Sequence, residues 1–291
     1  MSTQSSLFPP LPNDTARAAA ALHAKSIYLT IGDQIEDLLA NIDLARLDPS
    51  GERSASTLAL LALVTIFQFA ENLPDRRAAK ATRTHLDWKY ALHLPIAYPG
   101  LDSQALCKFR QHLLDDSETL PTFQQTIDRL AECGLLRSTD KERPEAIEVL
   151  DAVCVVSRLE QLAEAMHMSL EALAASKPEW LRAMTLPHWY ERYNQMLTTR
   201  CLPKSRGEQV SLAQAIGADA RYLLEAIASA NDDGNLALLP EVQTLRQVWH
   251  RQFNQSLHQI EWRLPSCASC TGVDEASDGL AYQVRREGLA Q

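Results

Sequence analysis

Apolar residues recur at helical spacing along most of the chain, and short polar or proline-bearing stretches separate the segments. In residues 27–47 the apolar positions fall three or four residues apart, which predicts an amphipathic helix. Residues 58–71, LALLALVTIFQFAE, are apolar on almost every side and predict a buried helix that Ser56 or Thr57 caps. A third helix is predicted in residues 75–92.

A break and a further helix follow this third helix. The segment LPIAYPG stops helix continuation because it contains two prolines, and its Gly100 allows a turn. Asp102 or Ser103 can cap the next helix, SQALCKFRQHLL. The positions of this helix that are expected to face the core are Leu106, Phe109 and Leu113. Another helix is predicted to begin at Pro121 and to end at Cys133 and Gly134.

The run AIEVLDAVCVV is the most β-prone stretch of the sequence. Its branched residues predict a strand in residues 147–156, with Asp151 at its centre. A single strand is not stable alone, so this one requires partners. Helical spacing returns in residues 158–230, and a loop and one long helix are predicted in residues 231–263.

These segments predict a mainly α fold: a helical bundle with a helix-turn-helix, then a lone strand of an incomplete domain, then a helical insertion. The predicted organisation is a flexible lead-in at 1–25, a helical domain at 26–140, a linker and strand at 141–157, a helical insertion at 158–263 and a disordered tail at 264–291.

Charge is distributed unevenly along the chain. The net charge of -9 argues against a protein that coats nucleic acid non-specifically, because such binding depends on neutralising phosphates. Residues 76–112 nevertheless contain seven cations and only two acids, which leaves a local charge of +5. This basic window coincides with the predicted pattern of helix, break and helix.

In a helix-turn-helix the first helix crosses the phosphate backbone and the second lies in the major groove. The residues expected to contact phosphates are Arg76, Arg77, Lys80 and Arg83. The residues expected to contact DNA from the second helix are Ser103, Gln104, Lys108, Arg110 and Gln111. The alternative is a solvated charged face on an ordinary helical bundle.

Asp151 is a second candidate, because an acid inside an apolar strand is costly unless it is paired or binds a metal. Two-metal phosphoryl-transfer sites hold Mg2+ with a carboxylate placed in this way. The alternative is an aspartate at a strand end that faces solvent.

Cys267 and Cys270 have the spacing of a zinc knuckle, but no second ligand pair follows, so a zinc site is not expected. A disulfide framework is not expected either.

The stretch from STLALLALV to KFRQHLL, residues 56–114, resembles the N-terminal InsH-like domain of bacterial insertion-sequence DDE transposases. The apolar helix is followed, in the same order as in that family, by ENLPDRRAAK, DWKYALHLP and PGLDSQALCKFRQHLL. The later segments PEWLRAM, HWYERY and LPKSRGEQVSLAQAIGADARYLLEAI are also similar to one branch of these enzymes. The resemblance covers roughly residues 30–265.

The resemblance implies a domain that binds terminal inverted repeats and an RNase H-like domain in which three acids hold two divalent metals. Asp151 lies where the first acid is expected, but Ala152 and Val153 follow it where relatives have a small residue and threonine. The second Asp and the distal Glu of the family have no counterpart in SCASCTGVDEASDGLAYQVRREGLAQ. The resemblance therefore implies a truncated or frameshifted copy with an aberrant tail.

The expected function is that of a transposase fragment that binds transposon ends, as double-stranded DNA, and does not cut DNA alone. Its expected partners besides DNA are further copies of itself or an intact transposase. Mg2+ is implied by the family, with Asp151 as a ligand only in a complete enzyme, and no stable binding is expected here. The alternative is a helical interaction protein or a regulator of an intact transposase. With no secretory signal and no bilayer-spanning run, a cytoplasmic, nucleoid-associated protein without a membrane partner is expected.

Overall fold

The computed structural model describes residues 8–22, 26–136, 143–199, 202–230, 236–255 and 260–263. In these residues the protein is mainly α-helical, as the sequence predicts. The helices are α1 (Asn13–Leu22), α2 (Ile27–Leu39), α3 (Ala55–Glu71), α4 (Asp75–Thr84), α5 (Leu86–Ala91), α6 (Ser103–Asp115), α7 (Leu120–Glu132), α8 (Ala146–Ser176), α9 (Pro178–Met184), α10 (Pro187–Thr199), α11 (Arg206–Ser229) and α12 (Pro240–Gln252). Short 3-10 helices lie at Leu44–Leu47 and Leu236–Leu238, and a hairpin consists of β1 (Phe253–Gln255) and β2 (Ile260–Trp262).

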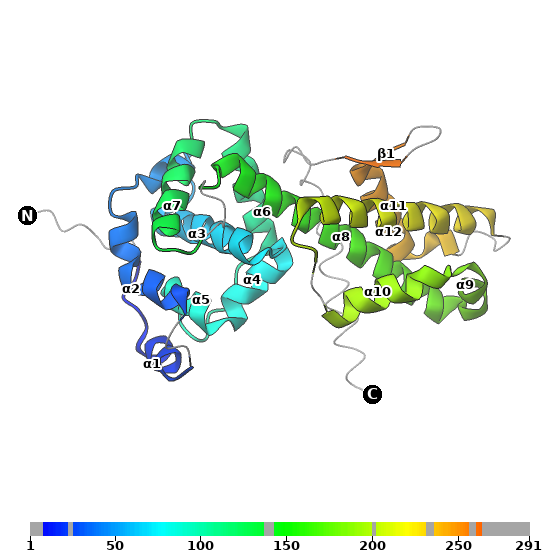
Figure 1. The fold of residues 1–291 in the computed structure, drawn as a ribbon, viewed down its shortest axis with the longest axis horizontal. Coiled ribbons are helices and arrows are strands. Elements are labelled where there is room, and N and C mark those ends of the chain that lie inside the picture. Colours follow the sequence, from blue (N-terminus) through cyan, green and yellow to red (C-terminus); the bar gives the residue numbers. More distant parts are fainter. Residues whose placement is uncertain are drawn as a thin grey trace, which may run out of the picture.

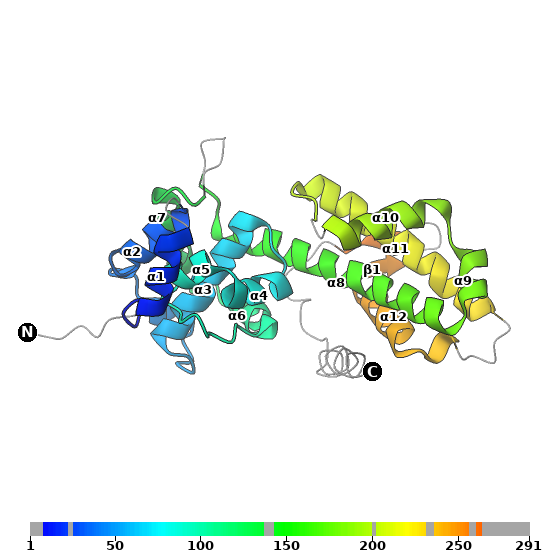
Figure 2. The ribbon, with the colours of Figure 1, turned by 90° about the horizontal axis from the view of Figure 1, so that it is seen from below.

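Two hydrophobic cores lie side by side, and α8 runs from one to the other (Figure 1). The first core is built from helices α2 to α7 and ends at Val149 and Leu150 in the first turns of α8. The second core begins at Val155 and includes residues from α10, α11, α12 and the hairpin. Figure 2 shows the same division from below. The α8 helix is therefore a structural part of both halves.

The predicted strand at 147–156 is wrong, because these residues form the first turns of α8. A helix that passes between two cores is covered on more than one side, so its sequence is apolar without clear amphipathic spacing. Its start is fixed by a hydrogen bond from the Glu145 N–H to Glu148 Oε2, at 3.2 Å. Burial against two cores thus overrides the β propensity of the valines. The lone strand of an incomplete RNase H-like domain is not present at these residues.

The two strands of the described residues, β1 and β2, form in the segment that was predicted to be the end of the final helix. This helix stops at Gln252, and residues 253–255 pair with residues 260–262 in an antiparallel hairpin. The predicted helix at 75–92 is divided at His85, whose extended backbone separates α4 from α5. Residues 13–22, predicted as part of a flexible lead-in, form α1, where Ala19 is buried and Thr15 Oγ1 donates to the Leu94 carbonyl at 2.8 Å.

Several local predictions are confirmed. Asp102 caps α6, since its side chain accepts a hydrogen bond from the Gln104 N–H at 3.0 Å. The predicted core positions of α6, Leu106, Phe109 and Leu113, are completely buried.

Other sequence predictions concern the cysteines and the tail. Cys154 is disulfide-bonded, which the sequence did not predict. The predicted tail at 264–291, with Cys267 and Cys270, lies outside the described residues. No single described helix is long and apolar enough to cross a bilayer, and α3 and α4 meet that criterion only together, across a 108° bend.

Candidate nucleic-acid interface

The start of α6 is held against the end of α4. Gly100, at a φ of +100°, lies where an added Cβ would be 3.2 Å from Arg83 Cβ, so the turn approaches α4 closely. The Leu101 N–H donates to Thr82 Oγ1 at 3.0 Å and fixes this contact. Ser103 and Gln104, the first residues of α6, are half-buried beside this turn. The fold thus places the predicted base-contacting end of α6 next to Arg83.

Three predicted DNA-contacting cations are exposed on this surface. Lys80 and Arg83 lie on α4, and Lys108 lies on α6. None of the three forms an ion pair with the residues that the structure describes. Lys89, by contrast, is buried and donates to the Ile96 carbonyl, and burial together with the nearby Arg83 lowers its pKa. We define Lys80, Arg83 and Lys108 as the open cationic patch.

Arg110 and Gln111 are not available at this surface. Arg110 is completely buried, and its two terminal nitrogens donate to the two carboxylate oxygens of Asp75, each at 2.6 Å. Gln111 is also buried. Arg110 was predicted to contact DNA because it lies in a basic helix, but its position is on the core side of α6. Its geometry assigns it to packing α6 against the start of α4.

Arg76 and Arg77 form ion pairs with carboxylates of α8. Arg76 pairs with Glu164, and Arg77 Nε lies 2.8 Å from Glu160 Oε1. At the first residue of α4, the Asp75 N–H donates to Ser157 Oγ of α8 at 3.1 Å. Burial raises the pKa of Glu160 to about 7, although the charge of Arg77 opposes this shift. Two of the three arginines predicted to neutralise phosphates therefore already face carboxylates.

Asp151 lies on α8, where it is half-buried and pairs with Arg206 at the start of α11. Among the described residues no group of three or more His, Cys, Asp or Glu side chains could hold a metal ion. A carboxylate that faces a guanidinium, without acidic neighbours arranged around it, does not fit a Mg2+ site. Asp151 therefore has the surroundings of a surface ion pair.

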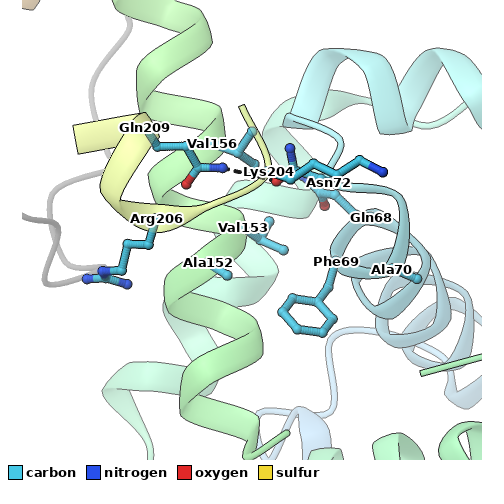
Figure 3. Close-up of a pocket in the computed structure, with 10 residues that line it drawn as sticks. All are labelled: Gln68, Phe69, Ala70, Asn72, Ala152, Val153, Val156, Lys204, Arg206 and Gln209. Atoms are coloured by element: carbon cyan, nitrogen blue, oxygen red, sulfur yellow. Dashed lines mark hydrogen bonds between the residues drawn. The ribbon is translucent and has the colours of Figure 1, made fainter. Parts of the chain in front are cut away.

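A cavity of about 280 Å3 lies where α3, α8 and the start of α11 meet (Figure 3). Its apolar lining includes Phe69 on α3 and Val153 and Val156 on α8. At its edge Asn72 Nδ2 donates to the Pro203 carbonyl at 3.1 Å, and Gln209 Nε2 donates to Asn72 Oδ1 at 3.1 Å. These hydrogen bonds fasten the start of α11 to the end of α3.

The residues around the predicted cations that the sequence pattern did not single out are Asp75, Ser157, Glu160 and Glu164. A signal for the last three is present, because they follow one another at i, i+3 and i+7 on one face of a helix. The two glutamates make this face of the helix negative, whereas the helix at 75–84 carries a positive net charge. The pairing itself links residues more than 80 positions apart, so local patterns do not predict it.

The fold and these cations define a mainly α-helical protein with a basic surface on α4 and α6. Residues 22–112, which contain the whole open cationic patch, match the transposase domain DUF772. No curated protein and no solved structure matches the chain. This match covers 91 of the 291 residues, so it shows that residues 22–112 are similar to a transposase domain.

Proposed function

We propose that the open cationic patch and the start of α6 bind double-stranded DNA at the terminal inverted repeats of an insertion sequence. The exposure of Lys80, Arg83 and Lys108 without an ion pair to any described residue is the observation that carries this proposal. Cations that are not neutralised inside the protein can replace the counterions of DNA phosphates. The transposase-domain match over the same residues supports DNA as the ligand.

The proposed interface uses α4 and α6 in the roles of the two helices of a helix-turn-helix. Residues 85–102 connect them and include α5, so the connection is longer than the three- or four-residue turn of simple members of that class. The close contact of Gly100 with α4 performs the role of the turn, because it holds the start of α6 beside Arg83. The proposal concerns DNA binding and assigns no cleavage step to Asp151.

The experiment measures binding of the full chain to a labelled duplex that carries the inverted repeat flanking its own coding sequence, over a range of salt concentrations. Lys80→Ala, Arg83→Ala and Lys108→Ala are each expected to weaken binding and to lower the slope of log affinity against log salt by about 1. The matched control is Arg251→Ala, which removes an exposed cation from α12 in the other half. Equal effects of the control and the patch variants would contradict the proposal.

The start of α6 is tested separately through sequence preference. Gln104→Ala is expected to reduce the preference for the inverted repeat over a random duplex by about tenfold, because a base-edge pair contributes about 1–3 kcal/mol of discrimination. The salt slope should stay unchanged, since Gln104 is uncharged. A Gln104→Ala variant that binds both duplexes more weakly by one common factor would show that α6 does not read bases through this residue.

A further inference from the structure

The α4 helix carries a basic stripe in which Arg76, Lys80 and Arg83 follow at i, i+4 and i+7, with Arg77 beside them. The two ends of this stripe differ. Lys80 and Arg83 belong to the open cationic patch, whereas Arg76 and Arg77 pair with carboxylates of α8. Only one end of the stripe therefore presents cations without a carboxylate partner among the described residues.

The α8 helix carries a matching stripe, which consists of Ser157, Glu160 and Glu164. The Ser157 hydroxyl accepts a hydrogen bond from the Asp75 N–H, at the helix end whose free N–H groups and dipole favour anions. Further along the same face of α8, Glu160 and Glu164 pair with Arg77 and Arg76. One hydroxyl and two carboxyl groups of α8 thus contact α4 at positions that DNA phosphates could take.

We infer that this stripe of α8 is an autoinhibitory contact, which competes with DNA phosphates for Arg76 and Arg77. The inference rests on the proposed function, because it regulates the same surface of α4. The competing groups are side chains, since α8 itself is held in place by Val149 and Leu150 in one core and Val155 in the other. DNA therefore displaces carboxylates from guanidinium groups without separating the helices.

The accessibility of the two ion pairs is consistent with this exchange. The side chains of Arg76 and Glu164 are 46% and 44% exposed, so a phosphate can approach this pair from solvent. In the deeper pair the side chains of Arg77 and Glu160 are 32% and 16% exposed, and burial raises the Glu160 pKa because it disfavours the carboxylate. Exposed ion pairs contribute little to stability, so exchange at the outer pair costs little folding free energy.

The test compares the full-length wild-type chain with the double variant Glu160→Gln and Glu164→Gln, using a fluorescein-labelled random-sequence duplex and fluorescence anisotropy. We expect about tenfold tighter binding at low salt and a salt slope steeper by up to about 2, because two cations become available to phosphates. Adding Arg76→Ala and Arg77→Ala to this variant should remove both gains. The matched control, Glu171→Gln with Glu225→Gln, makes the same charge change at exposed carboxylates outside the α4 contact.

A gain of the same size in the control would overturn the inference, since the effect would then follow from net charge alone. Unchanged binding by the folded double variant would overturn it as well. If the double variant melts below the assay temperature, Glu164→Gln alone provides the test, with an expected slope increase of about 1. A wild-type chain without salt-dependent DNA binding would instead overturn the proposed function, so the two failures are distinguishable.

Discussion

Arg110 and Asp75 form a two-point ion pair in which each terminal nitrogen of the guanidinium lies 2.6 Å from one carboxylate oxygen. Gln68 Nε2 donates to the same carboxylate at 2.7 Å. Asp75 thereby joins α3, the start of α4 and α6. The surface proposed to bind DNA consists of α4 and α6, so its geometry depends on the ion pair between the buried Arg110 and Asp75.

Replacing Arg110 should therefore act through the fold. Arg110→Ala is expected to lower the free energy of unfolding by about 3–5 kcal/mol, because it leaves the Asp75 carboxylate without its buried partner. Arg110→Lys should cost nearly as much, since an ammonium cannot make the two-point contact. Urea unfolding followed by circular dichroism measures both. Arg83→Ala, at an exposed cation, is the control and should change stability by less than about 0.5 kcal/mol.

A second prediction uses two glycines of α11. A Cβ added at Gly217 would lie 2.2 Å from Phe253 Cζ, whereas nothing lies within 4 Å of one added at Gly207. The Phe253 ring is buried and stacked on Trp249, with ring centroids 5.7 Å apart, so it cannot move aside cheaply.

Gly217→Ala is therefore expected to lower the free energy of unfolding by about 1–3 kcal/mol. Gly207→Ala should be neutral or stabilising by up to about 1 kcal/mol, because alanine favours a helix over glycine. Thermal unfolding of the two variants provides the comparison. Similar melting temperatures for both would mean that α11 and the hairpin are not packed as closely as the contact with Phe253 requires.

The elements that local chemistry specifies could be predicted from the sequence. Pro121 lies in the first turn of α7, and Gly134, at a φ of 89°, follows its end, as the sequence indicates. The Asp102 cap is likewise a local signal, because the side chain bonds to a backbone group two residues away. Such features require no knowledge of distant parts of the chain.

The features that depend on distant contacts could not be predicted in this way. Val149, Val153 and Val155 favour a strand locally, and only the two cores on either side explain why they are helical. Arg110 and Lys108 have similar local surroundings in the sequence, yet one is buried and the other exposed. The difference arises from Asp75, 35 residues earlier, which gives the buried guanidinium a partner.

A third prediction concerns Asp151. Asp151→Asn is expected to change the free energy of unfolding by less than about 1 kcal/mol, because its ion pair with Arg206 is partly exposed and screened by water. Mg2+ titrated into the wild-type chain and into the variant should give the same heats in calorimetry, since Asp151 faces a cation. Mg2+ binding that disappears in Asp151→Asn would refute this assignment and restore Asp151 as a metal ligand.

The last prediction follows from the pKa of Glu160, which burial raises from 4.5 to about 7. The groups that face this carboxylate are Arg77, Glu164 and Arg76. At pH values between 4.5 and about 7, Glu160 is protonated in the folded state and ionised in the unfolded state. The contribution of Glu160 to the free energy of unfolding therefore decreases as the pH rises from about 5 to 7.

Glu160→Gln removes this titration, and the variant should gain stability relative to wild type between pH 5 and pH 8. The limit of this gain is about 3 kcal/mol, which corresponds to the size of the pKa shift. Urea unfolding of both proteins at the two pH values gives the difference directly, and pH effects common to both proteins cancel. A stability difference between variant and wild type that is the same at both pH values would show that the Glu160 carboxylate is ionised throughout. The charge of Arg77 would then outweigh the desolvation of Glu160, and the contact between α4 and α8 would remain a full ion pair at every pH tested.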